Sequence, residues 1–410
     1  MLKEFLKNLF LNVREVAFSQ ILIAFLLIYQ VSIVSKGLGV EDYGRVGLIT
    51  VFAMTVFKIL HSKNSDVTLL ILKNRKHSIF LQSIFFDLIV GFISYLICIM
   101  IIRSSFNDLI GSYDLTLYLN LFLFSKIFQT VSETTKAHLI YQGEYKTLAF
   151  YETFPVIVRF VFIFAFFLYE PSVSNYLICY SIYSFVYATH GILIYKQKLN
   201  LFSQTSYNFK IYFQDMKKAY LKQRADQLTG IIPQNLDLLI LGYFTDYSSV
   251  GIFRIAKRLA EPINLIINSL VPIVQNNLSN NKDNFQLHDL VKYLLLPLSL
   301  FIFLFYLFIG EQAIKLISGQ SFISAYEPLL FISFGYLIYL NTFWIRQILL
   351  FENKIQYHTY GRLINTFTFL FIVSSFIINF GVSGLAVALS ISVLVQKIFE
   401  YFIYKKILSN

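Results

Sequence analysis

Stretches of about 20 mostly apolar residues, the length that a helix needs to cross a bilayer, recur along the whole chain. This pattern constrains the fold more than any other feature, and it predicts twelve membrane-spanning helices. The predicted spans are 15–35, 45–61, 79–102, 115–137, 147–169, 174–195, 223–244, 250–276, 290–309, 326–346, 358–380 and 382–404.

The composition agrees with this prediction. Apolar residues make up 57% of the 410 residues, and charged residues make up only 14%. A soluble fold of this length cannot enclose so large an apolar fraction. The sequence therefore predicts an all-α integral membrane protein.

Lysines and arginines predict the orientation, because they are retained on the cytoplasmic side of short loops. With the N-terminus inside, twenty of them fall on the cytoplasmic side, and the opposite loops hold only Lys36, Arg45, Arg103 and Lys315. We therefore expect a multi-pass protein with both termini in the cytoplasm. The net charge of +11 then reflects topology and contact with anionic lipid headgroups rather than nucleic-acid binding.

The longest connection between predicted spans divides the chain into six helices and six. We expect an N-terminal lobe at 1–199, a cytoplasmic linker at 200–222 and a C-terminal lobe at 223–410. Apolar residues recur at helical spacing among the lysines of the linker, which indicates an amphipathic helix in the membrane interface. A solvated linker is the alternative. The predicted outer loops are short, which argues against a polymerase or glycosyltransferase with a large outer domain.

The first hairpin of each half begins with a similar segment. Residues 30–44 read QVSIVSKGLGVEDYG, and residues 237–251 read DLLILGYFTDYSSVG. Asp42 and either Ser248 or Ser249 are candidate N-caps, and the final glycines, Gly44 and Gly251, allow close helix packing. The similarity predicts two six-helix lobes related by a pseudo-two-fold axis along the membrane normal, a common plan of transporters with substrate between the halves.

Three segments carry a resemblance to a known family. Residues 36–49, KGLGVEDYGRVGLI, resemble the outer turn of polysaccharide flippases of the multidrug/oligosaccharidyl-lipid/polysaccharide exporter superfamily. Residues 235–271 resemble that family's second-half segment, in which a polar helix end, a turn like VGIF and an AKRL run follow one another. Residues 341–397 are similar to its eleventh and twelfth helices.

This resemblance implies a Wzx-type flippase in the inner membrane of a bacterium. Such proteins move polyisoprenyl (undecaprenyl) diphosphate-linked oligosaccharides from the cytoplasmic to the outer leaflet for O-antigen or capsule assembly. Polysaccharide polymerase and chain-length proteins are the implied protein partners. The expected mechanism is alternating access, in which two lobes rock about a central cavity.

Cations inside the predicted spans point to function independently of the resemblance, because each costs roughly 2.5–3.5 kcal/mol at a helix centre. Their charge suits phosphate oxygens, which arginine can bind in bidentate fashion. The predicted substrate-binding residues of a cationic cavity are Arg159, Lys126, Lys257, Arg258 and Arg254. Structural alternatives place Arg254 and Lys257 at the outer interface and pair Arg258 with Glu261.

Carboxylates in or near the spans have two possible roles: they pair with these cations, or they bind a coupling proton or sodium ion. The candidates are Asp226, Asp237, Glu133, Glu152 and Glu261. No other cofactor, metal site or catalytic residue is expected. The sequence has no phosphate-binding glycine-rich loop of the P-loop kind, and Cys98 and Cys179 fall inside spans, where packing is the default role.

Two alternatives remain within the same superfamily. A multidrug or organic-cation antiporter predicts a cavity dominated by carboxylates, whereas the charges at mid-depth are mostly cationic here. A lipid II flippase differs only in the sugar that it carries, which the sequence does not resolve.

Overall fold

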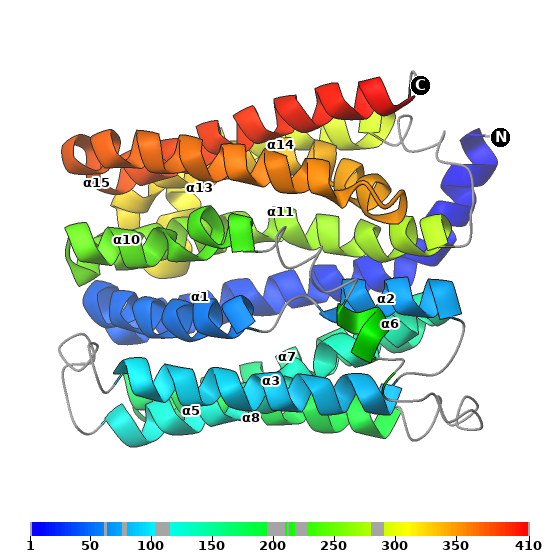
Figure 1. Cartoon of the computed structure of the whole chain (residues 1–410). Coiled ribbons are helices and arrows are strands. Elements are labelled where there is room, and N and C mark those ends of the chain that lie inside the picture. Colours follow the sequence, from blue (N-terminus) through cyan, green and yellow to red (C-terminus); the bar gives the residue numbers. More distant parts are fainter. Residues whose placement is uncertain are drawn as a thin grey trace. The chain divides into compact units, whose positions relative to one another are not determined.

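The computed structural model describes residues 2–60, 64–75, 80–102, 115–194, 210, 213–217, 228–279 and 291–408. Within these ranges the chain is helical apart from short turns, and no strand occurs (Figure 1). Seven helices in the described part are long and apolar enough to cross a membrane.

Two of these seven helices each cover two predicted spans. Helix α1 (Leu2–Leu60) contains the first two spans, and α15 (Ile355–Leu408) contains the last two. Each is interrupted by a glycine with a positive φ angle, 73° at Gly39 and 51° at Gly381. Side chains with a Cβ rarely adopt this conformation, so a glycine at each point lets the chain reverse between two spans.

The other predicted spans correspond to helices or to helices broken once. The third, fifth, sixth, eighth and tenth spans match α3 (Phe80–Ile101), α7 (Tyr145–Tyr169), α8 (Val173–Ile194), α11 (Tyr247–Ser279) and α14 (Tyr326–Phe351). The fourth span consists of α5 (Leu115–Thr130) and α6 (Ser132–Gln142).

The seventh and ninth spans contain π-helical turns. The π-helix η4 (Ile232–Leu236) precedes α10 (Asp237–Phe244), and η5 (Val291–Leu295) precedes α13 (Leu296–Ser318). A 3-10 turn, η6 (Gln320–Ala325), joins α13 to α14. Proline removes a backbone donor at Pro233 in η4, and such interruptions of the helical ladder are common at functional sites.

A further helix, α2 (Asn64–Arg75), was not predicted, because it is short and carries too many polar residues to resemble a span. Its apolar side chains Val67, Ile71 and Leu72 are buried against Met216. Met216 belongs to residues 213–217, a helical turn within the predicted linker. The described turn thus buries an apolar side chain against α2, and most of the linker lies outside the described residues.

The chain divides into two compact units. Unit 1 contains residues 1–51 and 228–410, and unit 2 contains residues 52–227. In unit 1, α14 packs against α11, α13 and α15; in unit 2, α8 packs against α5 and α7 (Figure 1). The lobe boundaries predicted from the sequence stay a prediction.

In unit 1, the two similar glycine segments pack directly on each other. A Cβ built on Gly44 would overlap the carbonyl oxygen of Tyr247, and one built on Gly251 would overlap that of Val40. The predicted close packing is therefore confirmed, and it is a backbone-to-backbone contact between α1 and α11. The cap prediction was wrong for α11: Asp246 Oδ1 accepts from the Ser249 N–H at 2.8 Å.

Candidate functional site

Arg159 lies near the middle of α7 in unit 2, with only 6% of its surface exposed. Its guanidinium carbon lies 4.7 Å from the ring centroid of Tyr180 and 4.6 Å from that of Tyr183, both on α8. Among the described residues it has no hydrogen bond and no ion pair, and its Nε is buried without a partner. Cation–π contacts contribute about 2 kcal/mol each when desolvated, whereas an unpaired buried charge costs several. Arg159 therefore holds a positive charge that lacks a counter-ion in this part of the chain.

Lys126, on α5, is a second cation of unit 2 without a carboxylate partner among the described residues. Its Nζ donates to Gln129 Oε1 at 2.6 Å and lies 5.1 Å from the Phe122 ring centroid. Gln129 Oε1 also accepts from Ser184 Oγ on α8 at 3.3 Å, which ties α5 to α8 at this level. Lys126 is near enough to Arg159 for the two charges to repel. The structure thus brings two predicted binding residues together.

The candidate carboxylates of unit 2 have polar partners. Glu152 forms an ion pair with Lys136 from α6, and Glu133 accepts a hydrogen bond from Ser65 Oγ at 2.8 Å. Lys136 also lies within electrostatic range of Glu133. These carboxylates therefore neutralise Lys136 and do not pair with Arg159 or Lys126.

In unit 1, the three predicted cations of α11 are each engaged. Arg254 donates to the Tyr43 carbonyl oxygen at 2.7 Å and lies over the Tyr43 ring. It is 3% exposed and packs beside the close glycine contact between α1 and α11. Arg254 therefore holds α1 against α11, and its predicted place at the outer interface stays a prediction.

The other two cations of α11 form ion pairs. Lys257 Nζ lies 2.5 Å from Oδ2 of Asp237, whose side chain is fully buried. Arg258 donates to Glu261 with nitrogen–oxygen distances of 2.7 and 2.8 Å, the predicted structural alternative. Two candidate cations and two candidate carboxylates are thus paired with one another. Asp226, the remaining carboxylate, lies outside the described residues.

The sequence reasoning missed two sets of buried charges. Asp87 on α3 is fully buried and accepts from Thr134 Oγ1 at 2.8 Å. Glu400, also fully buried, accepts from His358 Nδ1 at 2.7 Å and from Lys397 Nζ at 2.6 Å. Each lies inside a predicted span, so a search for every ionisable residue in the spans would have found them. Within the described ranges, no group of three or more His, Cys, Asp or Glu residues is arranged to hold a metal ion.

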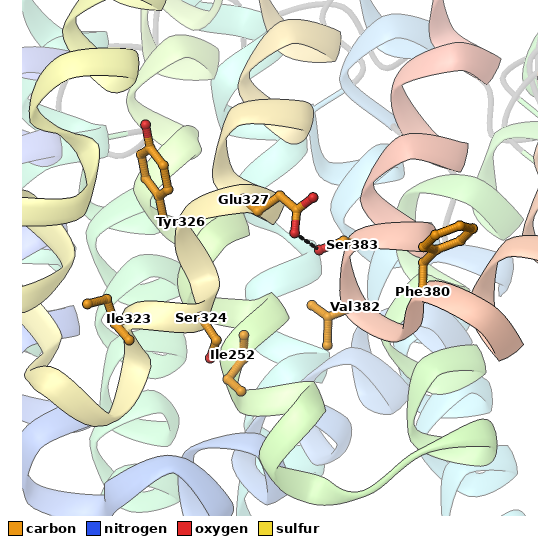
Figure 2. Close-up of a pocket in the computed structure, with 8 residues that line it drawn as sticks. All are labelled: Ile252, Ile323, Ser324, Tyr326, Glu327, Phe380, Val382 and Ser383. Carbon is orange, nitrogen blue, oxygen red and sulfur yellow. Dashed lines mark hydrogen bonds between the residues drawn. The ribbon is translucent and has the colours of Figure 1, made fainter.

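A cavity of about 410 Å³ opens in unit 1, lined by residues of α11, η6, α14 and α15 (Figure 2). Glu327 in the first turn of α14 accepts a hydrogen bond from Ser383 Oγ at 2.8 Å across this cavity. Ile252, Ile323 and Phe380 supply apolar lining. None of the predicted site residues lines it.

Residues 33–327, more than half of the chain, match the family model described as polysaccharide biosynthesis protein. The chain belongs to the polysaccharide biosynthesis protein family. This confirms the family resemblance inferred from the sequence. Among curated proteins, none matches this chain.

Solved structures show the fold of this family member. The lipid II flippase MurJ, in an inward closed conformation, is 16% identical, with a TM-score of 0.70 over 95% of this chain and 87% of that chain. A transporter of the MOP superfamily from Pyrococcus furiosus is 13% identical, with a TM-score of 0.73 over 97% and 95%. The Vibrio cholerae MATE transporter VcmN is 12% identical, with a TM-score of 0.69 over 97% and 98%.

These similarities confirm the predicted fold class, an all-α membrane protein with about twelve spanning helices. The fold is therefore the one found in these solved transporter and flippase structures. The roles of the individual charged residues stay predictions.

Proposed function

We propose that this protein is a flippase for polyisoprenyl diphosphate-linked oligosaccharide repeat units, which it moves from the cytoplasmic to the outer leaflet by alternating access. The observation that carries the proposal is the pair of uncompensated cations Arg159 and Lys126 in unit 2. A lipid-linked diphosphate is an anion that must pass the membrane interior, and two unpaired cations at mid-depth meet that requirement. The family match supports a product that serves polysaccharide assembly.

The assembly that receives these units is O-antigen or capsular polysaccharide, with a polymerase and chain-length proteins as partners. The protein lies in the bacterial inner membrane with both termini in the cytoplasm. A proton or sodium gradient drives any uphill step, through one of the candidate carboxylates, of which Asp237 is the most deeply buried in the described part.

Replacing Arg159 with Gln tests the proposal. Loss of the Arg159 charge, which has no ion pair among the described residues, should abolish surface polysaccharide and cause lipid-linked repeat units to accumulate on the cytoplasmic face. Lys315→Gln is the matched control, because it also removes one cation but at a site about two-fifths exposed and salt-bridged to Glu311. Normal polysaccharide in an Arg159→Gln strain with normal protein level would remove Arg159 from the binding site.

Two other functions share this fold. A lipid II flippase would make deletion of the gene lethal and would cause lipid II rather than a repeat unit to accumulate. A multidrug antiporter, suggested by a similar structure described as a multidrug resistance MATE family transporter, requires carboxylates free to bind a cationic drug. The described candidate carboxylates of unit 2 are instead engaged by Lys136 and Ser65, which favours an anionic substrate.

A further inference from the structure

Five tyrosines of unit 2 form a row of neighbouring rings, which we call the tyrosine column: Tyr176, Tyr180, Tyr183 and Tyr187 on α8, and Tyr151 on α7. Ring centroids are 4.4 Å apart for Tyr176 and Tyr180, 5.6 Å for Tyr183 and Tyr187, and 4.8 Å for Tyr151 and Tyr187, each pair with stacked planes. Arg159 fills the one wider step, between Tyr180 and Tyr183. The column is therefore a row of rings with a single cation inside it.

Helical periodicity builds the column. Spacings of four, three and four residues place the tyrosines of α8 on one face, about one ring per turn of 5.4 Å. The chain holds 44 phenylalanines and 28 tyrosines, yet positions 176, 180, 183 and 187 on this face are all tyrosine. Phenylalanine would fill the same space without a buried polar group to satisfy, because a buried phenol needs a hydrogen-bond partner. Packing alone therefore does not explain why these positions carry tyrosine rather than phenylalanine.

Two of those hydroxyls have no partner in the described part of the chain. Tyr151 donates to the Ser132 carbonyl oxygen at 3.4 Å. Within the described ranges, the hydroxyls of Tyr183 and Tyr187 have no hydrogen bond, and both residues are partly exposed. Both hydroxyls are therefore open to a molecule that can reach the column. Both lie on the cytoplasmic side of Arg159 in the predicted orientation of α8.

The chemistry of a ligand for this surface follows from these features. The ring faces are occupied by one another, so a ligand meets hydroxyls and ring edges. The stacking also fixes the hydroxyls in place, and fixed tyrosines bind at a low entropic cost. A row of phenol hydroxyls next to an uncompensated cation matches a polyhydroxylated group joined to an anion, as in a glycosyl diphosphate.

We propose that Tyr183 and Tyr187 bind the first sugars of the lipid-linked glycan, next to the diphosphate that Arg159 holds. This inference rests on the proposed function and adds to it the residues that recognise the sugar. Within unit 2, Arg159 and Lys126 then bind any polyisoprenyl diphosphate, and the hydroxyls of Tyr183 and Tyr187 add affinity only when a sugar is attached.

The test measures binding of two defined probes to purified protein in lipid nanodiscs: undecaprenyl diphosphate, and undecaprenyl diphosphate that carries one N-acetylhexosamine. Wild type should bind the sugar-bearing probe more tightly. The double variant Tyr183→Phe/Tyr187→Phe keeps both rings, and it should lose roughly 3- to 10-fold of affinity per hydroxyl for that probe. Its affinity for the bare diphosphate should not change.

Tyr169→Phe is the matched control, because Tyr169 is 91% exposed at the end of α7; it should keep the preference for the sugar. A double variant that retains the full preference overturns the inference, as does a wild type that binds both probes equally; in either case the proposed function stands. A wild type that binds neither probe removes the proposed function itself. Tyr183→Leu removes a ring from beside Arg159 and should weaken binding of both probes to a similar degree.

Discussion

Replacing Asp237 with Asn should reduce the free energy of unfolding by about 2–4 kcal/mol, since it leaves the charge of Lys257 without its partner. Breaking a buried pair on one side costs about 3–5 kcal/mol. We take a smaller figure because the Lys257 side chain is 20% exposed and gains some solvent screening, although Asp237 is fully buried. Asp237 also accepts from the Leu238 N–H at 2.8 Å, an interaction that Asn can keep.

Lys257→Met completes a double-mutant cycle with Asp237→Asn. In the Asp237→Asn background it should restore most of the lost free energy of unfolding. A buried ion pair replaced on both sides by uncharged groups of similar volume is often close to neutral. The coupling energy between the two sites should therefore be about 2 kcal/mol or more, above the range for independent positions. Unfolding by SDS in bicelles, followed by far-ultraviolet circular dichroism, measures each corner of the cycle.

Glu311→Gln is the matched control, because it also removes a carboxylate from a lysine pair of unit 1, with side chains 42% and 47% exposed. Exposed pairs contribute about 0–1 kcal/mol, so this variant should unfold close to wild type. The reasoning fails if Asp237→Asn costs no more than Glu311→Gln, or if the two mutations at 237 and 257 are additive. The same variants also report on coupling. A stable double variant that makes normal surface polysaccharide would limit Asp237 to a structural role.

Two further predictions concern the first turn of α11 and its contact with α1 in unit 1. Gly44→Ala and Gly251→Ala should each destabilise the protein by several kcal/mol and lower its yield in the membrane, because each Cβ meets a backbone carbonyl. Gly47→Ala is the control and should destabilise the protein less, since its Cβ meets the movable side chain of Arg254. Asp246→Ala should cost about 0.5–1 kcal/mol at neutral pH, as for an exposed N-cap. The hydrogen bond from the Ser249 N–H lowers the pKa of Asp246 in the folded protein. The stabilisation by this cap is therefore fully present above the ordinary aspartate pKa of the unfolded chain, near 4. It is lost as the pH falls through the lower pKa of Asp246 in the folded protein. The free energy of unfolding of wild type and of Asp246→Ala, measured as a function of pH, should differ less in acid. A difference that does not change with pH would contradict the role of Asp246 as the cap.

The helices could be predicted from the sequence because the membrane imposes a fixed length on apolar segments. The predicted spans therefore match the described helices, including both pairs that meet at Gly39 and Gly381. Helix α2 escaped prediction because it is buried by packing on one face, through Val67 and Ile71, and is too short and polar to show a membrane signal. The π-turn at η4 also leaves no periodicity in so short a stretch.

The charged residues of the site could be found from the sequence, but their pairing could not. Arg159 and Lys257 have the same appearance there, as single cations in apolar spans. The structure separates them: Lys257 meets Asp237, twenty positions earlier in the chain, whereas Arg159 meets only tyrosine rings among the described residues. Pairing depends on which helix faces are in contact, and one sequence does not contain that information. The repeated tyrosines of α8 were visible at helical spacing, but only the stacked geometry gives them a role.

The difference between paired and unpaired cations also bears on how transport is coupled to an ion. In the proposed function, Arg159 and Lys126 can receive a diphosphate without giving up any described ion pair, so we expect them to bind it first. Under the same proposal, an anion that drew Lys257 away from Asp237 would leave a fully buried carboxylate without its cation, and a proton or a sodium ion would then have to supply the positive charge. We therefore expect substrate binding at Lys257 and ion binding at Asp237 to be linked through the ion pair between these two residues. This expectation makes Asp237 a stronger coupling candidate than Glu152, because Lys136, the partner of Glu152, is not one of the predicted substrate-binding cations.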